Sequence, residues 1–319
     1  MNDLGTVLAC APLSEEILQW LRSRVAVREV RPKSKKDLIA ALTPEVSALI
    51  MGSKPPVDGE VMDRAPGLRV VGRKGVGVDN IDLDAARVRG IFVVNTPLAP
   101  MEAVAELMVG LMVALARRLI HMDRAVRSGD WEARHRWMGP ELQGKTLGLV
   151  GFGRIGQRVA ELVQPLAMRV LYYDMRRVPE LEARLGVQAT DLPTLFAESD
   201  WVSVHLPLTK ETHHFVGREL FALMKPTAYF INLARGPVVD EEALTAVLQA
   251  GRIAGAALDV FEEEPIPPEH PLCALENVIL TPHIGGLSQE GDRAQCEVAY
   301  DILAVLEGRS PRWAVVRPT

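Results

Sequence analysis

The chain has 319 residues, of which 48% are hydrophobic and 24% are charged, and its formal net charge at pH 7 is −5. This length suits two globular domains, and the acidic balance argues against a protein that binds nucleic acid or an anionic membrane surface. The chain opens with no basic region before a long apolar core, and no apolar run reaches about 18 residues, so we expect a cytoplasmic protein without a signal peptide or a membrane span.

Residues 1–96 alternate short apolar runs with polar, helix-like segments. The predicted strands are Thr6–Ala9, Val25–Val30, Ala48–Met51, Leu68–Gly72 and Phe92–Val94. The predicted helices are Ser14–Arg24, Lys35–Leu42, Gly59–Ala65 and Leu83–Arg89. Alternation of this kind with short connections predicts a parallel sheet with helices on both faces.

A glycine-rich segment, Arg73–Asn80, follows the fourth of these strands, and Gly52–Pro56 lies at the same edge of the predicted sheet. Ligands of parallel sheets bind at the carboxyl ends of the strands, and glycine turns can present backbone N–H groups to a small anion. Arg73 and Lys74 beside the turn make it a candidate anion site. The alternative is a tight turn before the next helix.

A long apolar helix, Met101–His121, follows the break at Asn95–Pro97. Apolar residues run almost all the way round it, so we expect it to be buried on most sides. Two interpretations stay open: the helix packs against a second subunit, or it lies centrally between the two domains.

The alternation resumes between Gly144 and Gly286, which indicates a second parallel sheet. Its predicted strands are Thr146–Val150, Val170–Tyr173, Trp201–His205, Ala228–Asn232, Gly255–Leu258 and Val278–Leu280, and helices are expected to start near Ile155, Asp191, Arg218 and Asp240. A final helix, Ser288–Leu306, would return the chain to the first domain. The predicted domains are residues 1–98 with 288–319, and residues 99–287, with a ligand cleft between them.

The first strand, turn and helix of the second domain form a dinucleotide fingerprint. Gly151, Gly153 and Gly156 link an apolar strand to a helix, and Asp174 ends the next strand, 18 residues after Gly156. In this motif the glycines permit a tight turn, close approach of the backbone to a pyrophosphate, and close packing of helix on strand. The helix N-terminus attracts the phosphates and the acid holds the ribose hydroxyls, so we expect a bound dinucleotide.

Asp174 also bears on which dinucleotide binds. A carboxylate at the ribose repels a 2′-phosphate, which favours NAD over NADP. Arg176 and Arg177 follow at once and could serve a 2′-phosphate, or they could be solvated loop charges. We therefore predict NAD, with NADP less favoured.

Three strand-end segments of the second domain carry residues suited to acid–base chemistry: Arg235, Glu264 and His283. A guanidinium grips a carboxylate with two hydrogen bonds, a histidine exchanges a proton near neutral pH, and a neighbouring carboxylate orients the imidazole. The competing candidates are His205, His213, His214, Glu262 and Glu263. The sequence alone does not show that the first three meet.

The three cysteines, Cys10, Cys273 and Cys296, form no CxxC pair. A sparse, odd set predicts buried thiols in a reducing compartment rather than a disulfide or zinc framework, and no metal site is expected.

Together these motifs resemble the D-isomer-specific 2-hydroxyacid dehydrogenase family. The matching segments are Gly75–Asp82, Asn95–Pro97 with Ala103–Glu106, Gly144–Gly156, His205–Thr209, Asn232–Asp240, Asp259–Pro265 and Thr281–Gly286. The resemblance implies an α/β fold in which a Rossmann cofactor domain is inserted into a flavodoxin-like substrate domain. It also implies a homodimer built on the 101–121 helix.

The resemblance further assigns roles to single residues. The family's catalytic triad falls on Arg235, Glu264 and His283, and its substrate-carboxylate turn falls on Val76 and Gly77. Its cofactor contacts fall on Arg154, Ile155, Asp174, His205, Pro207, Thr212, Ala234, Asp259, His283 and Gly286. The implied reaction is reversible reduction of a 2-keto acid by NADH. Arg235 would hold the substrate, His283 paired with Glu264 would donate the proton, and Asp259 would orient the nicotinamide amide.

Within the family, segments 73–82 and 95–97 are most similar to phosphoglycerate dehydrogenases, although the regulatory tail of their longer forms is missing. The chain departs from those enzymes at Gly52–Ser53, Lys74 and Pro100, and Lys54 or Lys74 could offset an arginine lost from the phosphate side. The candidate substrates are therefore 3-phosphoglycerate, glyoxylate, hydroxypyruvate and other small 2-keto acids. The alternative hypothesis is a non-catalytic NAD sensor of the same fold.

Overall fold

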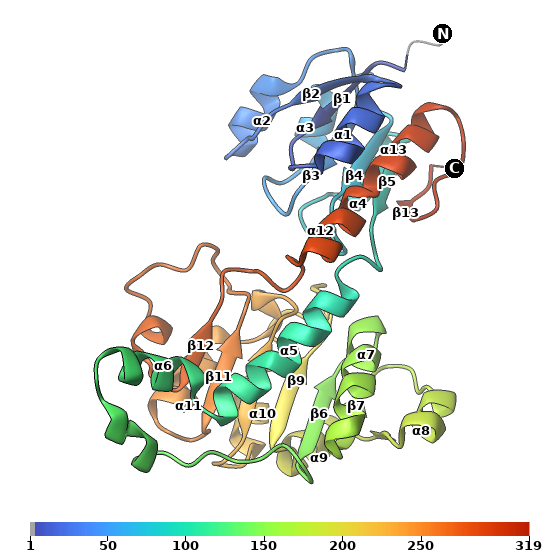
Figure 1. Ribbon diagram of the computed structural model, residues 1–319. Coiled ribbons are helices and arrows are strands. Elements are labelled where there is room, and N and C mark those ends of the chain that lie inside the picture. The colour runs from blue at the N-terminus through green and yellow to red at the C-terminus, as the bar shows by residue number, and fades with distance from the viewer. Residues whose placement is uncertain (1–3, 319) are drawn as a thin grey trace. The chain divides into compact units, whose positions relative to one another are not determined.

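The computed structural model describes residues 4–318, and residues 1–3 and 319 of the predicted substrate domain lie outside this range. The chain divides into two compact units (Figure 1). Unit 1 joins the segment that ends at Pro100 with the segment that starts at Gly286, and unit 2 is Met101–Gly285. These boundaries lie two residues from the predicted ones.

Unit 1 contains a six-stranded sheet with the order β13-β5-β4-β3-β1-β2. Its strands are β1 (Thr6–Ala9), β2 (Ala26–Glu29), β3 (Val46–Met51), β4 (Val70–Arg73), β5 (Phe92–Asn95) and β13 (Ala314–Val316). The first five are parallel in the flavodoxin-like order, as predicted. The edge strand β13, which the sequence did not predict, pairs antiparallel with β5. A three-residue strand is too short to show a periodicity.

Helices cover both faces of the unit 1 sheet. They are α1 (Glu15–Arg22), α2 (Lys35–Ala41), α3 (Gly59–Asp63), α4 (Leu83–Val88), α12 (Gln289–Cys296) and α13 (Val298–Leu306). The core under one face includes residues of α2, α3 and α4, and the core under the other includes α1, α12 and α13. The predicted single helix Ser288–Leu306 is two helices. The Glu297 N–H bonds only three residues back to Ala294, a tighter turn that ends α12.

Unit 2 contains a seven-stranded, wholly parallel sheet with the order β12-β11-β10-β9-β6-β7-β8. Its strands are β6 (Thr146–Val150), β7 (Arg169–Tyr173), β8 (Gln188–Ala189), β9 (Trp201–Val204), β10 (Tyr229–Asn232), β11 (Gly255–Leu258) and β12 (Val278–Leu280). This is the Rossmann order with one added strand. The direction of winding reverses between β6 and β9, the point where such sheets bind dinucleotides.

Two helical layers enclose this second sheet (Figure 1). The helices are α5 (Met101–Ala116), α6 (Leu119–Arg127), α7 (Arg154–Val163), α8 (Pro179–Leu185), α9 (Leu192–Glu198), α10 (Arg218–Leu223) and α11 (Glu241–Gln249). Short 3₁₀ turns occur at Trp131–His135, Gln164–Leu166, Gly236–Val238 and Pro271–Ala274. The core under one face draws on α5 and α7, and the core under the other on α9, α10 and α11.

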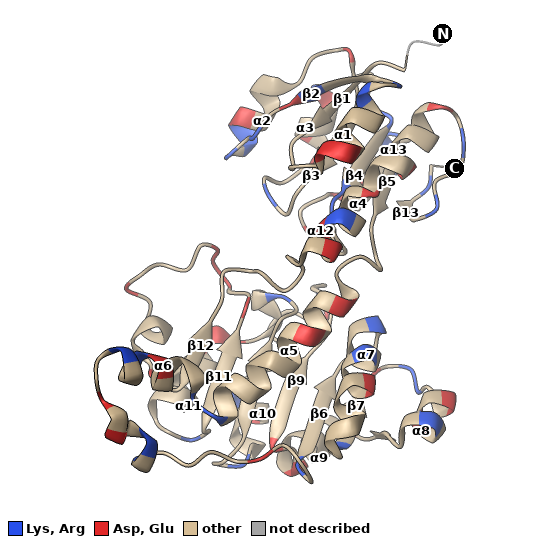
Figure 2. Ribbon diagram, in the orientation of Figure 1, with Lys and Arg blue, Asp and Glu red and all other residues tan. Residues whose placement is uncertain are grey.

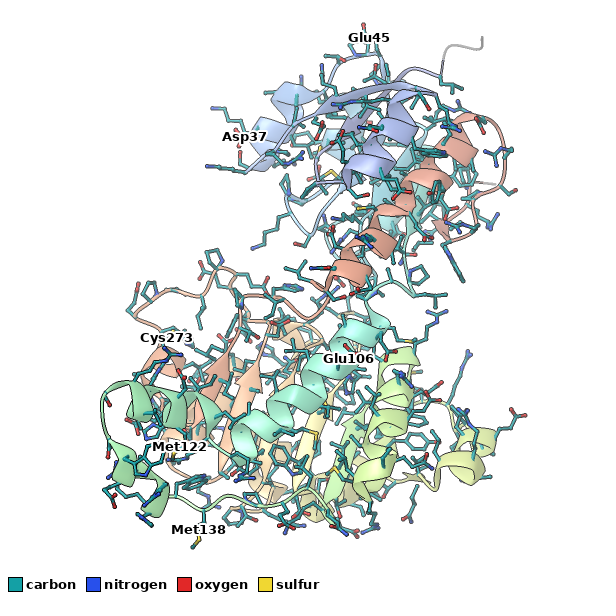
Figure 3. All side chains as sticks on the ribbon, viewed as in Figure 1. Asp37, Glu45, Glu106, Met122, Met138 and Cys273 are labelled. Atoms are coloured by element: carbon teal, nitrogen blue, oxygen red, sulfur yellow. The ribbon has the colours of Figure 1, made fainter. Side chains whose placement is uncertain are left out.

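The predicted helix Met101–His121 ends earlier than expected. Helix α5 stops at Ala116, because Arg118 adopts a left-handed backbone conformation with φ +46° before α6 begins. The charged residues of α5 lie near its start (Figure 2), and Glu106 is labelled on its surface in Figure 3. One strip of the helix, Glu106, Gly110 and Val113, is exposed, while the opposite side is buried against its own sheet.

The cysteines are unpaired, as predicted, but one of them is not buried. Cys10 and Cys296 lie in the core of unit 1, and burial raises the pKa of the Cys10 thiol to about 12. Cys273 is exposed (Figure 3), because it lies in a short 3₁₀ turn at the surface of unit 2. Within residues 4–318, we find no helix with the length and apolar character needed to cross a membrane.

Candidate active site

The three predicted catalytic residues follow three neighbouring strands of unit 2. Arg235 lies after β10, Glu264 after β11 and His283 after β12. Because β10, β11 and β12 are adjacent and parallel, their carboxyl ends form one edge of the sheet. The fold therefore brings the segments that carry these residues to the same edge.

His283 and Glu264 form a hydrogen-bonded pair. The Nδ1 atom of His283 lies 2.9 Å from Oε2 of Glu264, and both side chains are partly buried. A carboxylate only accepts hydrogen bonds, so Nδ1 carries the proton and Nε2 is the nitrogen left for a ligand. The other Glu264 oxygen, Oε1, accepts the N–H of Phe261 at 3.2 Å. Both partners are thus held in a fixed orientation.

The buried carboxylate of Asp259 organises the turn that carries His283. It accepts hydrogen bonds from Thr281 Oγ1 at 2.6 Å, from Ile284 N–H at 2.8 Å and from Gly285 N–H at 2.7 Å. The sequence assigned Asp259 to the nicotinamide amide, and it did not reveal these three contacts. In the structure, Asp259 binds the Thr281 side chain before His283 and two backbone N–H groups after it.

Arg235 leaves the end of β10 in a loop fixed by Asn232. The buried Asn232 side chain accepts the N–H of Ala234 and donates to the carbonyl of Arg235, both at 3.0 Å. Gly236 follows at once, and a Cβ at this position would overlap the carbonyl of Phe261. Only glycine therefore allows the arginine loop to pack against the loop that carries Glu264.

The competing histidines have different surroundings. His205 follows β9 directly. Its Nε2 is buried and, within residues 4–318, without a hydrogen-bond partner, and burial lowers its pKa to about 4. It is therefore neutral at physiological pH. His213 and His214 are exposed, and His214 pairs with Glu262. Glu262 therefore has an ionic partner, while Glu263 is exposed.

The glycine turn after β6 has the geometry that a dinucleotide needs. Gly151 has φ +99°, and a Cβ there would lie 2.9 Å from the carbonyl of His205. A Cβ on Gly156 would lie 2.5 Å from the carbonyl oxygen of Gly151, whereas one on Gly153 would meet nothing within 4 Å. Since no side chain caps the N-terminus of α7, its N–H groups and the open side of Gly153 fit a pyrophosphate.

Asp174 lies beside this turn, at the end of β7. Its Oδ2 accepts the N–H of Phe152 at 2.7 Å, and its Oδ1 accepts the N–H of Arg176 at 3.1 Å. The Arg177 guanidinium is bound to Glu182. The arginine charge nearest to the acid in sequence is thus exposed Arg176, while Arg177 is already paired.

The remaining predicted cofactor positions are spread over both units. Arg154 and Ile155 open α7, and Ala234 lies between Asn232 and Arg235. Pro207 and Thr212 belong to one loop after β9, in which Thr212 Oγ1 donates to the Pro207 carbonyl at 2.6 Å. Gly286 belongs to unit 1, where the Gln295 side chain donates to its carbonyl at 2.8 Å.

The predicted anion turn lies after β4 in unit 1. Gly75 has φ +132°, and its N–H and carbonyl both bond to Thr96, at 3.0 Å each. Asn95 donates to the carbonyl of Val76 at 2.6 Å. Lys74 is buried, and its Nζ lies 2.6 Å from Asp292 Oδ1 at the start of α12. The lysine charge is therefore balanced within unit 1, which the sequence did not reveal.

A separate cavity of about 460 Å³ lies at the amino ends of the unit 2 strands. It is lined mainly by Trp137, Lys145, Trp201 and Tyr229, and by none of the predicted site residues.

The chain matches the model of a known protein family, described as "D-isomer specific 2-hydroxyacid dehydrogenase, NAD binding domain", over residues 109–285. It is 46% identical to a glyoxylate reductase of Thermofilum pendens over 287 residues, which are 88% of this chain and 84% of the relative. It is 41% identical to a D-3-phosphoglycerate dehydrogenase of Archaeoglobus fulgidus over 98% of this chain, but it spans only 59% of that relative.

The chain is also similar in three dimensions to a solved structure. The D-lactate dehydrogenase of Aquifex aeolicus, complexed with NAD and lactic acid, superposes with a TM-score of 0.89 at 30% identity. The match covers 98% of this chain and 100% of that one.

Proposed function

The chain belongs to the D-isomer specific 2-hydroxyacid dehydrogenase family, and we propose that it reduces a small 2-keto acid to the 2-hydroxy acid, with the D configuration where the product is chiral. The observation that carries the proposal is the 2.9 Å bond between His283 and Glu264, at the sheet edge that also carries Arg235. NADH, when bound, supplies the hydride for C2 of the keto acid.

The protein's own residues supply the rest of the chemistry. Arg235 binds the substrate carboxylate and carbonyl oxygen through its guanidinium, which suits a planar, two-pronged contact. Protonated His283 donates its Nε2 proton to the oxygen that becomes the hydroxyl, while Glu264 holds Nδ1 and stabilises the imidazolium. In the reverse direction the same pair accepts the proton.

We propose NAD rather than NADP as the cofactor. The Asp174 carboxylate stands at the ribose position of the fingerprint and repels a 2′-phosphate. Arg177 is paired with Glu182, which leaves Arg176 as the nearby cation that a 2′-phosphate would have to recruit. The contacts proposed for NAD are those at Gly151, Gly153, Arg154, Ile155, Gly156, Asp174, His205, Pro207, Thr212, Ala234, Asp259 and Gly286.

The favoured substrates are glyoxylate and hydroxypyruvate, whose side chains carry no charge. Val76 and Gly77 would bind the substrate carboxylate through their N–H groups. Lys74 beside them is paired with Asp292, so it offers no unbalanced charge for a phosphate. 3-Phosphoglycerate is the second candidate, supported by the Arg73–Asp82 motif and by the phosphoglycerate dehydrogenase relative.

The test is oxidation of NADH, followed by absorbance, with glyoxylate, hydroxypyruvate, pyruvate and phosphohydroxypyruvate, repeated with NADPH. We expect turnover with glyoxylate or hydroxypyruvate and a preference for NADH. His283→Ala should lower kcat by about 10²–10⁴-fold while NADH still binds. NADH binding without turnover on any 2-keto acid would instead favour the non-catalytic sensor.

We also propose that the chain forms a homodimer through α5. The exposed strip carries one charged side chain, Glu106, beside Gly110 and Val113, and the apolar side chains of Trp131 and Met138 in the following segment are also exposed. Figure 3 labels Met138, which is 94% exposed. Light scattering after size exclusion should give a dimer mass. Gly110→Arg should give a monomer and Glu180→Arg on α8 a dimer; a wild-type monomer would refute the proposal.

A further inference from the structure

The first residue of α11, Glu241, makes two contacts with the loop that carries Glu264. Its Oε2 accepts the N–H of Glu262 at 3.2 Å, and its Oε1 lies 3.3 Å from Nε2 of His270. The Glu241 side chain is only 12% exposed, and burial raises the pKa of its carboxyl. Glu241 therefore holds this loop on both sides of Glu264.

The contact with Glu262 lies next to the one that fixes the catalytic carboxylate. The N–H of Phe261 binds Glu264, and the N–H of the following residue, Glu262, binds Glu241. These two N–H groups belong to consecutive peptide units that share the Cα of Phe261, so a displacement of the Phe261–Glu262 peptide would disturb both hydrogen bonds. Gly236 packs against the same peptide, so the arginine loop shares this support.

His270 lies beside Glu241 at the C-terminal end of the loop that carries Glu264. Its Nδ1 accepts the N–H of Leu272 at 3.3 Å, so the proton of the neutral ring is on Nε2, the nitrogen that lies 3.3 Å from Glu241 Oε1. His270 thereby caps the 3₁₀ turn Pro271–Ala274 and bridges it to α11. At the near end, His214 binds the Glu262 side chain.

From this geometry we infer that Glu241 is a positioning residue for the reduction: it fixes the Phe261–Glu262 peptide and so keeps the Glu264 carboxylate aligned on Nδ1 of His283. Glu241 acts on the pair through the backbone of the loop that carries Glu264. The inference rests on the proposed function, because it assumes that the His283–Glu264 pair moves a proton in the reaction.

Two substitutions distinguish the effect of the length of the Glu241 side chain from the effect of its charge. Glu241→Gln keeps the length and an oxygen for the Glu262 N–H, and it should retain at least about half of kcat. Glu241→Asp keeps the charge at the start of α11, where acids are favourable, but it is one methylene too short to reach that N–H. It should fold and lose about tenfold in kcat, with KM for the keto acid and Kd for NADH within about twofold of wild type. Glu242→Ala, an exposed neighbour, is the matched control and should be fully active.

A double-mutant cycle tests whether the effect passes through Glu264. In a Glu264→Gln background, Glu241→Asp should cause little further loss of kcat. An equal loss in both backgrounds, or retention by Glu241→Asp with loss by Glu241→Gln, would overturn the inference. A protein that reduces no 2-keto acid at all would refute the proposed function instead, and that result is visible in the wild type alone.

Discussion

His283 has φ +54°, a left-handed conformation that costs a non-glycine residue about 1 kcal/mol or more. The three hydrogen bonds to the Asp259 carboxylate hold the chain in this conformation on both sides of the imidazole. The cost of this conformation is therefore offset by hydrogen bonds to Asp259, a buried acceptor that lies outside the loop of His283. At the scale of single residues, the site depends on such supporting groups as much as on the residues that touch the substrate.

The Asp259→Asn variant tests this support. An amide has one acceptor oxygen, so one of the N–H groups of Ile284 and Gly285 would lose its partner. We expect the free energy of unfolding to fall by about 1–3 kcal/mol, and kcat to fall as the His283 turn loosens. Denaturant titration and NADH oxidation measure the two effects. Glu263→Gln, in an exposed position of the neighbouring loop, should change neither; an Asp259→Asn protein of wild-type stability would contradict the prediction.

His205 predicts how stability depends on pH. Its pKa is about 4 in the folded protein, because of burial, and near 6.5 when unfolded, so the unfolded chain takes up a proton first as pH falls. The contribution of His205 to the free energy of unfolding is fully present above pH 6.5 and is lost progressively as the pH falls toward 4. It amounts to less than about 3 kcal/mol, since the residue as a whole is only partly buried. Between pH 7.5 and 5, the free energy of unfolding should fall less in His205→Gln than in wild type; equal falls would speak against it.

At the scale of elements, the glycines of the turn and of α7 have two different roles. Gly156 lies against the carbonyl of Gly151, so a side chain there would prevent close packing of α7 on the turn. Gly153 faces open space, so the absence of a side chain there leaves room for a ligand. The sequence motif alone gives all three glycines, and only the structure separates their roles by distance.

The two alanine variants should therefore behave in opposite ways. Gly156→Ala forces α7 away from β6 and should lower the melting temperature by several degrees. Gly153→Ala should leave the melting temperature unchanged but weaken NADH binding at least about tenfold, because the methyl group occupies the place of the pyrophosphate. Thermal unfolding and NADH fluorescence titration distinguish them. A Gly153→Ala protein that binds NADH as tightly as wild type would show that the phosphates lie elsewhere.

Secondary structure was predictable where the pattern was long or strongly apolar. The strands β1, β6 and β11 match the predicted ranges, because continuous apolar runs mark buried parallel strands. The break at Arg118 was not predictable, since arginine rarely adopts a positive φ and no glycine or proline marks the position. The short β8 and β13 were missed because two or three residues show no periodicity.

At the scale of the whole molecule, the two units differ in how the chain builds them. Unit 2 is one continuous segment, and both of its hydrophobic clusters contain only residues 104–280. Unit 1 is made from two segments, and α13 from the second one packs on the strands of the first. Unit 2 thus has a complete core of its own.

A fragment of residues 101–285 should consequently fold and bind NADH. We expect one cooperative unfolding transition and an NADH Kd within about tenfold of the full chain. We expect no turnover, because Val76 and Gly77 of the proposed substrate turn are missing. Denaturant unfolding and fluorescence titration measure both. A fragment without a cooperative transition would show that unit 2 depends on unit 1 for its stability.

The sequence predicts the reactive groups of the candidate site, but it does not predict the residues that hold those groups in place. Arg235, Glu264 and His283 stand in recognisable motifs at strand ends, so their chemistry could be inferred in advance. Glu241 and the Lys74–Asp292 pair could not, because each acts across loops or segments far apart in the sequence. Distances of this kind follow from how the sheet and its loops pack, which no local pattern encodes.

The split construction of unit 1 also sets an order of events during protein synthesis. The face of its sheet that carries Val7, Ala48 and Val70 is covered by α1 together with α13, and α13 is translated only after all of unit 2. A nascent chain therefore holds a finished cofactor unit while the N-terminal sheet still exposes an apolar face. Until the last helix leaves the ribosome, that face is available to chaperones or to aggregation.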